Sequence, residues 1–464
     1  MDLCSLPNDI LILIAESLEE RNDRLSLARC CHHFHDVLMP VAFTNIDVQS
    51  NCPFVLSCLV HLILRNPRYG ESVRSLNLAF WLCDHPLKCR FKRKLMLGAI
   101  RRLTQNEEDI EAWENCLRDK PETGGWGQAD GWRAMLLTLV PNLEVLSIHG
   151  ELVSALRGKI VTRASRGEKP FNTVPVLGHL REVNLRGWLE HAPASLEDDI
   201  IPFLTFPTMR ELSLTELYDD GKCEDNELPT ESGISKLAFW ESNSQTGFRS
   251  IVRACKELKN FAYVHRMDSE GQNPLNPTGI YETLLHHVNS LEHIVVSYDI
   301  KQEASDPKED AFLGSLNRFT RLKQLRIRAT NLLPWDSVNK CFEDCLMGVL
   351  PPSLELLDID DCHRTPNPVA LVEQFEDFYR NSDAGSYDIK CLTICGAFLE
   401  WHSGTPDGRR GGGPPKEFWM RLGARLTTAV GSGCFLIVDA NALKEYGNGL
   451  VPKWCYRPNA FRGT

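Results

Sequence analysis

The sequence predicts an α/β solenoid, in which parallel strands on an inner face alternate with helices outside. Two observations predict this fold. A six-residue pattern with apolar residues at its first, fourth and sixth positions occurs ten times, and from Leu143 onward the copies recur at intervals of 24 to 37 residues. Segments with the apolar spacing of a helix lie between the copies. A motif that returns at such a period indicates an array of stacked units.

The copies cover most of the chain. They lie at 73–78, 143–148, 180–185, 209–214, 234–239, 258–263, 291–296, 322–327, 354–359 and 389–394. Two weaker copies, at 43–48 and 435–440, are expected to cap the array.

The alternation inside each copy predicts a strand with one buried face, because successive side chains of a strand point to opposite faces. A closed barrel or a doubly wound sheet would cover both faces and would show continuous apolar runs. Ten copies also exceed the eight strands of a (β/α)8 barrel. The positions between the apolar ones are largely polar here, so we expect one face of the sheet to meet solvent. They include Ser75, Asn77, Glu182, Asn184, Glu211, Ser213, Gln324 and Arg326.

Apolar residues at helical spacing predict helices between the strands. One stripe consists of Val338, Cys341, Phe342, Cys345, Leu346 and Val349, and another of Leu371, Val372, Phe375, Phe378 and Tyr379. Strand, helix and strand in one chain direction require parallel pairing. This alternation resembles the leucine-rich repeat family in its long-period form, which places a helix on the outer side of each strand. The asparagine ladder typical of that family is largely missing here.

Composition limits the compartment and the partners. The 464 residues are 43% hydrophobic and carry a net charge of −11, which argues against a general nucleic-acid binder. The longest apolar run, near 55–64, is too short to span a bilayer, so no membrane partner is expected. Seventeen cysteines without framework spacing favour free thiols in a reducing compartment. We expect no signal peptide before the motif that begins at Leu6, because Asp2 and Asp9 flank it. We therefore expect a protein of the cytoplasm, the nucleus or both.

Residues 5–38 do not follow the repeat and form short amphipathic helices. So short a segment cannot bury all of its apolar surface alone, so part of that surface is expected to meet a partner. An ordered pattern runs through Leu6, Pro7, Ile10, Leu11, Ile14, Leu18, Asp23, Leu25, Leu27, Cys31 and Phe34. With this pattern the chain resembles the F-box family, with Asp9 where glutamate is usual and Arg24 where an apolar residue is common. The resemblance implies that these residues, Asp23 and Cys31 excepted, bind the Skp-type adaptor of a cullin-RING ubiquitin ligase. The alternative is that this segment only caps the repeats.

The predicted organisation has three parts. A helical F-box-like motif covers 5–48, the repeat solenoid covers 49–403 with an insertion at about 79–140, and a glycine-rich linker with a C-terminal cap covers 404–464. The insertion holds a basic run over 88–102. This run is either a nuclear import signal or, as we favour, the solvated face of a helix whose apolar side includes Phe91, Leu95 and Ile100.

Catalytic and metal-binding patterns were compared with the sequence. Cys83, His85 and Cys89 lie close together, but structural zinc requires a matching second pair of ligands. Cys341 and Cys345 fall on the first apolar helix stripe, so we expect them to pack in the core. No G-x-S-x-G, H-E-x-x-H or G-x-G-x-x-G pattern is present. We therefore expect no metal, no cofactor and no catalytic residue in this chain.

Aromatic residues follow five consecutive strands, and stacked repeats would gather them along one rim. They are Trp188, Tyr218, Trp240, His265 and Tyr298. Charged neighbours, among them Glu216, Glu241 and Arg266, give this rim the composition of an interaction hot spot. We therefore predict that these five residues contact a target protein. The alternative is that the rings pack into the edge of the sheet.

Together these features predict a substrate receptor of an SCF-type ubiquitin ligase. Its F-box would bind the Skp-type adaptor and thereby the cullin, and its repeats would hold an unknown target protein. Other subunits would transfer ubiquitin, so this chain would supply proximity and not catalysis. The alternative is an F-box and repeat scaffold or sensor that binds a partner without ligase activity.

Overall fold

The fold is described on a computed structural model. It describes residues 3–18, 20–48, 53–78, 91–118, 126–149, 155–173, 175–186, 200–217, 231–244, 246–266, 274–298, 311–336, 338–339, 341–360, 367–381, 389, 391–395 and 434–438.

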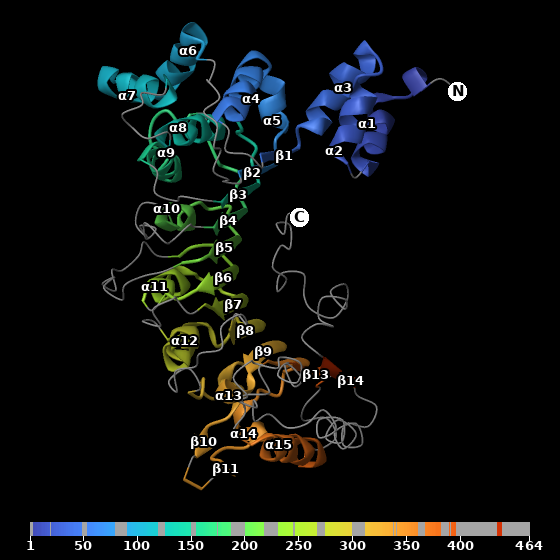
Figure 1. Cartoon of the computed structure of the whole chain (residues 1–464), viewed down its shortest axis with the longest axis vertical. Coiled ribbons are helices and arrows are strands. Elements are labelled where there is room, and N and C mark those ends of the chain that lie inside the picture. The colour runs from blue at the N-terminus through green and yellow to red at the C-terminus, as the bar shows by residue number, and fades with distance from the viewer. Residues whose placement is uncertain are drawn as a thin grey trace, which may run out of the picture. The chain divides into compact units, whose positions relative to one another are not determined.

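The chain divides into two compact units. The first consists of Met1–Thr215 and Leu228–Ile234, and the second of Glu216–Glu227 and Ser235–Thr464. In each unit parallel strands follow one another in sequence order, and helices lie on one face of those strands (Figure 1).

The first unit contains five parallel strands in the order β1 to β5. Their bounds are β1 Asn45–Val48, β2 Ser75–Leu78, β3 Val145–His149, β4 Glu182–Arg186 and β5 Glu211–Thr215. Each described pairing joins equivalent positions of successive repeats, such as Leu76 with Leu146 and Leu146 with Val183. The repeats are therefore stacked in register.

The second unit continues the same design with seven parallel strands. They are β6 Lys236–Ser242, β7 Asn260–His265, β8 His293–Tyr298, β9 Gln324–Arg328, β12 Leu356–Asp360, β13 Cys391–Cys395 and β14 Cys434–Val438. All ten predicted copies and both weaker ones therefore contain a strand. The predicted α/β repeat solenoid is confirmed, whereas the predicted domain boundaries stay predictions.

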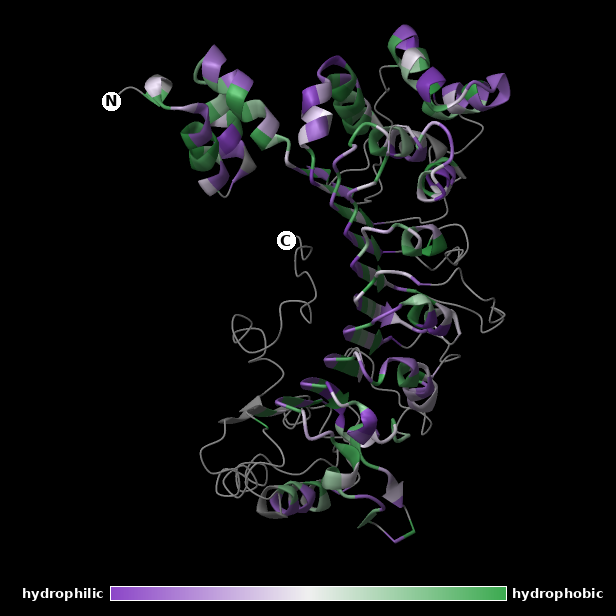
Figure 2. Ribbon diagram, turned by 180° about the vertical axis from the view of Figure 1, so that it is seen from behind, coloured by the Kyte–Doolittle hydropathy of each residue, from purple (hydrophilic) through white to green (hydrophobic). Residues whose placement is uncertain are grey.

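The helices of the first unit form the N-terminal module, the insertion and the outer layer of the repeats. Their bounds are α1 Asn8–Ser17, α2 Arg21–Ala28, α3 His32–Ala42, α4 Pro53–Arg65, α5 Pro67–Ser72, α6 Arg93–Leu103, α7 Glu107–Arg118, α8 Trp126–Leu137, α9 Ala155–Ser165 and α10 Ile201–Leu204. Figure 2 shows hydrophilic and hydrophobic residues mixed along α6 and α7, as amphipathic helices require.

The second unit has described helices between most of its strands, four of them with eight residues or fewer and one, α15, with 14. They are α11 Gly247–Ala254, α12 Pro277–Leu284, α13 Ala329–Leu332, α14 Leu346–Val349 and α15 Pro368–Asn381. Three short 3-10 segments complete the described helices of the chain, at Leu3–Ser5, Leu285–His287 and Leu316–Arg318. Leu371, Phe375 and Phe378 of α15 are buried, which confirms the second helix stripe. None of the helices within the described ranges is both long and apolar enough to cross a membrane.

The core is built from rows of equivalent side chains. The first residue of the repeat is fully buried in nine copies, from Val73 to Leu354. The fourth and sixth residues point to the same side, as Phe239 and Phe261 do in β6 and β7, whose ring centroids lie 6.2 Å apart. A buried apolar side chain contributes about 1.5–3 kcal/mol, so these rows hold the stack together.

The predicted helix over 338–349 is wrong. The segment instead forms a two-stranded antiparallel hairpin, with β10 at Trp335–Asp336 and β11 at Cys341–Phe342, followed by the four residues of α14. The Asp336 carboxylate accepts hydrogen bonds from the backbone N–H groups of Val338 (2.7 Å) and Asn339 (3.1 Å). Such local bonds compete with a helix and favour a turn.

The predicted core packing of Cys341 and Cys345 fails with that helix. Both thiols are exposed, and Val338 is 86% exposed. The apolar spacing of these residues was therefore coincidental. All seven cysteines whose state is described are free thiols, in line with the expectation from the sequence.

The fold predicts that truncating a side chain in the row of buried aromatic residues lowers stability strongly. Phe261→Ala is expected to lower the free energy of unfolding of the second unit by about 3–5 kcal/mol, because the side chain is fully buried and leaves a cavity. Urea unfolding followed by circular dichroism measures this change. Val338→Ala is the matched exposed control and should stay within about 0.5 kcal/mol of the unchanged protein. Equal losses in both variants would contradict the packing described here.

Candidate functional site

The inner face of each unit is the face that carries the first, third and fifth residues of the strands, opposite the helices. In the first unit these side chains are exposed on β1 and half-buried on β2 to β5, and most of them are polar. Asn77 donates to Asp47 (3.1 Å) and Asn184 donates to Ser147 (3.3 Å), so side chains on neighbouring strands are linked along the face. The expectation that one face of the sheet meets solvent is confirmed there.

In the second unit the inner face begins with an apolar cluster, here called the Trp240 patch. It consists of Trp240 with Ala238, Ala262, Val264 and Val295. Trp240 is 7% exposed, Ala262 0% and Val295 4%, so the expectation of a solvent-facing surface is wrong for β6 to β8. The physical reason lies in the sequence, because the inner positions of these strands carry alanine and valine where earlier strands carry serine, asparagine and glutamate.

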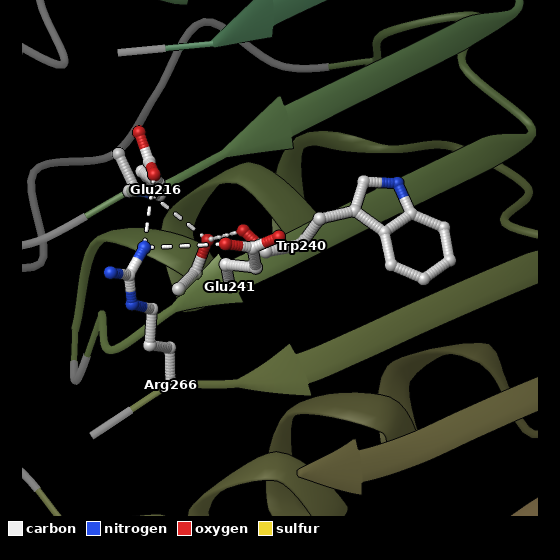
Figure 3. Close-up of polar contacts among 6 residues, drawn as sticks. Glu216, Trp240, Glu241 and Arg266 are labelled. Atoms are coloured by element: carbon white, nitrogen blue, oxygen red, sulfur yellow. Dashed lines mark hydrogen bonds and ion pairs between the residues drawn. The ribbon is translucent and has the colours of Figure 1, made fainter. Parts of the chain in front are cut away.

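An ionic cluster, here called the Arg266 clamp, stands at the carboxyl ends of the strands beside this patch. The Nη1 atom of Arg266 lies 3.0 Å from Oε1 of Glu216 and 3.2 Å from Oε2 of Glu241. The two carboxylate side chains are 16% and 11% exposed, whereas Arg266 is 37% exposed. Figure 3 shows the three charged groups converging while the indole of Trp240 points away from them.

Backbone contacts hold the clamp in place. The N–H of Glu216 donates to the carbonyl of Trp240 (2.8 Å), and the hydroxyl of Ser242 accepts from the N–H of Leu217 (3.0 Å). The pairing of β6 with β7 shifts register between Phe239 and Ser242, so the strand bulges at this point. A bulge re-aims the side chains of a strand and increases its local twist.

The two glutamates of the clamp have strained backbones. Glu216 has a φ of 61° and Glu241 a φ of 48°, in the left-handed region that disfavours residues other than glycine, asparagine and aspartate. Strain of this kind costs about 1–3 kcal/mol per residue and persists only where the surroundings determine the conformation. The clamp is therefore preorganised, and it places fixed charge next to the buried apolar cluster around Trp240.

A second ionic cluster lies on the inner face of β8, β9 and β12. The Asp360 carboxylate accepts a hydrogen bond from Nε of Arg326 (2.7 Å) and another from the hydroxyl of Ser297 (2.7 Å). Burial raises the pKa of the neighbouring Asp358, while a hydrogen bond from Thr393 and the charge of Arg326 oppose that rise and the charge of Asp360 adds to it. This part of the face therefore carries coupled charges whose balance depends on pH.

The predicted row of exposed aromatic residues is wrong where the structure describes it. Trp240, His265 and Tyr298 are 7%, 0% and 4% exposed. Burial lowers the pKa of His265 to about 3, and the charge of Arg328 adds to that effect, so the imidazole is neutral at physiological pH. The rings pack against one another, with the centroids of His265 and Tyr298 5.2 Å apart. Their contact with a target stays a prediction, which the burial does not favour.

The charged residues next to that row do come together in the structure. Glu216, Glu241 and Arg266 come together in the clamp, although they lie up to 50 residues apart in the chain. Trp188 and Tyr218 lie outside the described residues. The sequence reasoning missed Asp358 and Asp360, whose signal was an acidic residue at two successive inner positions of one strand.

The N-terminal module has a core of its own. Helices α1 to α3 bury a shared cluster made of Leu11, Ala15, Ala28, Phe34, Leu38 and Val41. The ring of Phe43, just after α3, stacks on Tyr69 of α5 with centroids 4.7 Å apart and planes within 3°. The next residue, Thr44, accepts a backbone hydrogen bond from Arg74 (2.8 Å). The module therefore joins the first repeat through a short, packed connection.

The predicted adaptor-binding residues fall into three groups. Leu11 and Phe34 are 1% and 3% exposed and belong to the core of the module, so a direct contact with a partner is not available to them. Leu6, Ile14, Leu18, Leu25 and Leu27 are half-buried. Pro7 and Ile10 are exposed, and Ile10 has 42% of its surface free.

Two further apolar side chains extend that exposed surface. Leu3 is 53% exposed and Leu13 is 59% exposed. With Ile10 they make up half of the six large apolar side chains that are exposed among the described residues. Ile10 and Leu13 lie three residues apart, on the same face of α1, and we call these two residues the α1 stripe.

Arg24, the departure from the F-box pattern, has a clear role. Its Nε and Nη2 atoms both donate to the carbonyl of Leu18, at 2.9 and 2.7 Å, directly after the end of α1. A helix leaves its last carbonyls without partners, and a cation there also complements the helix dipole. Arg24 therefore fixes α2 against the end of α1.

Metal binding finds no support in the described residues. No three His, Cys, Asp or Glu side chains among them come together in a way that could hold a metal ion. Cys83, His85 and Cys89 lie outside the described ranges.

Comparison with known families decides the family of the repeats. A model of the leucine-rich repeat domain matches residues 140–388, which is more than half of the chain. The chain belongs to the leucine-rich repeat family. No curated protein matches the sequence. The leucine-rich repeats cover β3 to β12, including the Trp240 patch, the Arg266 clamp and the Asp358 and Asp360 pair. Leucine-rich repeats typically bind partner proteins, so the family indicates protein binding for this part of the chain.

The Arg266 clamp of the leucine-rich repeats gives a test by double-mutant cycle. Arg266→Met leaves two carboxylates facing each other without a cation and is expected to cost about 1–2 kcal/mol of unfolding free energy. Glu241→Gln removes one of these charges, so the double variant should show a coupling energy of about 1 kcal/mol between the two sites. Urea unfolding of the four proteins measures it. Strict additivity would mean that the clamp contributes nothing.

The leucine-rich repeats also predict a pH effect at Asp358. Its folded pKa is raised, so the stability linked to this group is present below the unfolded pKa and is lost as pH rises through the folded pKa. Asp358→Asn should therefore raise the urea midpoint at about pH 7 and leave it unchanged at about pH 3.

The matched control for Asp358 is the exposed Asp336. Hydrogen bonds from Asn339 and Val338 hold the pKa of Asp336 below its usual value, so its contribution is present above the unfolded pKa and is lost as pH falls. Asp336→Asn should lower the midpoint at neutral pH. A shift of the same sign in both variants would contradict the assignment.

Proposed function

We propose that this leucine-rich repeat protein is the substrate receptor of a cullin-RING ubiquitin ligase. In this proposal helices α1 to α3 bind a Skp-type adaptor, and the inner face of the repeats binds a target protein. The chain has no catalytic role, because the other subunits of the ligase transfer ubiquitin. The receptor raises the effective concentration of target lysines near the conjugating enzyme.

The α1 stripe is the observation that carries this proposal. The module buries Leu11, Phe34 and Leu38 in its own core and still exposes Ile10 and Leu13 on one face of α1. Exposed apolar side chains gathered in one place mark interaction surfaces. A module whose folding does not need these residues can use them for a partner.

The packed connection between the module and the repeats supports the same function. A receptor must hold its target at a set distance from the ligase. The stacked rings of Phe43 and Tyr69 and the hydrogen bond from Arg74 to Thr44 leave no linker between α3 and β1. Movement of the module against the first repeat would break these contacts.

The test is binding to a purified Skp-type adaptor in complex with the N-terminal domain of a cullin. The double variant Ile10→Asp, Leu13→Asp is expected to weaken binding by about 100-fold or more, because each apolar side chain contributes about 1.5–3 kcal/mol when it is buried. Both residues are exposed, so circular dichroism should show an unchanged fold.

The control variant is Val55→Asp, which replaces an apolar side chain of similar exposure (41%) on α4. It should bind the adaptor complex like the unchanged chain. If the double variant also binds normally, the α1 stripe does not dock the adaptor. If the chain binds the free adaptor but not the adaptor with cullin, it is a scaffold and not a ligase receptor.

A further inference from the structure

Helices α6 and α7 form an extra pair inserted between β2 and β3. The connection between β2 and β3 thus holds three described helices, α6, α7 and α8, whereas the connection between β1 and β2 holds two, α4 and α5. The pair packs through Ile100 and Leu103 of α6 and through Ile110, Trp113 and Leu117 of α7, which are all buried. An insertion that the repeat itself does not need offers its outer surface for another use.

The two faces of α6 differ sharply. Met96, Ala99, Ile100 and Leu103 are buried and recur at the spacing of one helix face. The opposite face carries Lys94, Gly98, Arg101 and Arg102, and all four are exposed. We call these four residues the α6 basic face. It contains three cations and no carboxylate.

The basic face has no counterion among the described residues. In the insertion Glu114 pairs with Arg93 (2.8 Å) and also with Arg118. No described carboxylate lies within ion-pair distance of Lys94, Arg101 or Arg102. Arg102 donates to the carbonyl of Gly98 on its own helix (3.4 Å), which is an uncharged acceptor.

Gly98 stands in the middle of this face without a reason in the chain's own packing. A Cβ atom at this position would meet nothing within 4 Å. Glycine inside a helix costs stability relative to alanine, so the chain gives up helix stability here for no internal contact. A missing side chain between Lys94 and Arg101 makes room for the close approach of another backbone.

We propose that the α6 basic face is a docking site for an acidic segment of a partner protein. The segment lies over Gly98, and its carboxylates pair with Lys94, Arg101 and Arg102. The proposal concerns a surface apart from both the α1 stripe and the inner face, so it does not depend on the ligase function.

The charge around the face favours an acidic protein over a nucleic acid. Glu107, Glu108 and Glu111 are exposed on the adjacent α7, and the whole chain carries a net charge of −11. A long phosphate backbone would have to pass these carboxylates, whereas a short acidic segment fits on three cations along one helix. Nucleic-acid binders need a broader basic surface.

The test is fluorescence anisotropy with the full chain and a fluorescein-labelled decaglutamate peptide. Binding should be measurable at low salt and should weaken as salt rises, because exposed charge pairs are screened. The variant Lys94→Glu, Arg101→Glu, Arg102→Glu should weaken binding by about tenfold or more. A control with the same change in net charge, Arg68→Glu, Lys159→Glu, Arg318→Glu, alters three exposed cations elsewhere and should keep most of the binding.

A steric pair of variants tests the contact over Gly98. Gly98→Trp should weaken binding of the peptide, whereas Ala112→Trp, at an exposed small residue of α7, should not. Equal losses in the two charge variants, or no binding at low salt, would overturn the proposal. Tighter binding of a labelled ten-residue oligothymidylate, lost in the same variant, would also overturn it in favour of a phosphate polyanion. Unchanged binding by Gly98→Trp would overturn the placement over Gly98.

Discussion

The structure depends on one backbone contact that recurs from repeat to repeat. The carbonyl of the second residue in each repeat accepts two N–H groups of the next repeat, as Glu144 and Val145 donate to Arg74 at 2.8 and 2.9 Å. The same pair of bonds links Lys259 to Glu292 and His293, and Lys323 to Glu355 and Leu356. Because both donors come from adjacent residues, the contact fixes where each strand starts. A strand displaced by one residue would turn its apolar side chains away from the core.

Because the strands pair in register, side chains at equivalent positions of successive repeats form rows that run across the strands. One row holds the buried leucines that carry the stability, and the row beside it makes the inner face. Where the inner positions hold alanine, valine and tryptophan, the face is apolar, and where they hold Arg326 and Asp358 it is charged. The bulge of β6 interrupts the rows between Phe239 and Ser242. There the chain accepts strain at Glu216 and Glu241 and brings two acids onto one arginine.

The N-terminal module follows a different principle. Three short helices close a small core around Leu11 and Phe34, and the apolar residues left over form the α1 stripe. Arg24 holds α2 at the end of α1 through two bonds to a single carbonyl. The two parts therefore present different surfaces. The module presents apolar side chains on a helix, and the repeats present a face made of parallel strands. The stacked rings of Phe43 and Tyr69 connect the module to the first repeat without a linker.

The sequence alone determined the architecture. Apolar residues at three positions of a six-residue pattern placed all twelve parallel strands, because alternation along a strand depends on covalent geometry and not on distant contacts. The spacing of apolar residues along the chain was likewise sufficient to predict helices at α6 and α15, because the turn of a helix also follows from local backbone geometry.

Only the tertiary structure decided which side chains meet. In the sequence, Trp240, His265 and Tyr298 have the pattern expected of exposed residues at the rim. They are nevertheless buried, and the rings of His265 and Tyr298 pack against each other from neighbouring strands. The segment over 338–349 has helical spacing but forms a hairpin, because Asp336 bonds to the backbone of the turn. Likewise, the pattern could not show that Leu11 points into the module while Leu13 points out, or that Glu216 and Arg266 meet across 50 residues. Periodicity reports which residues share a face, whereas burial and pairing depend on what packs against that face.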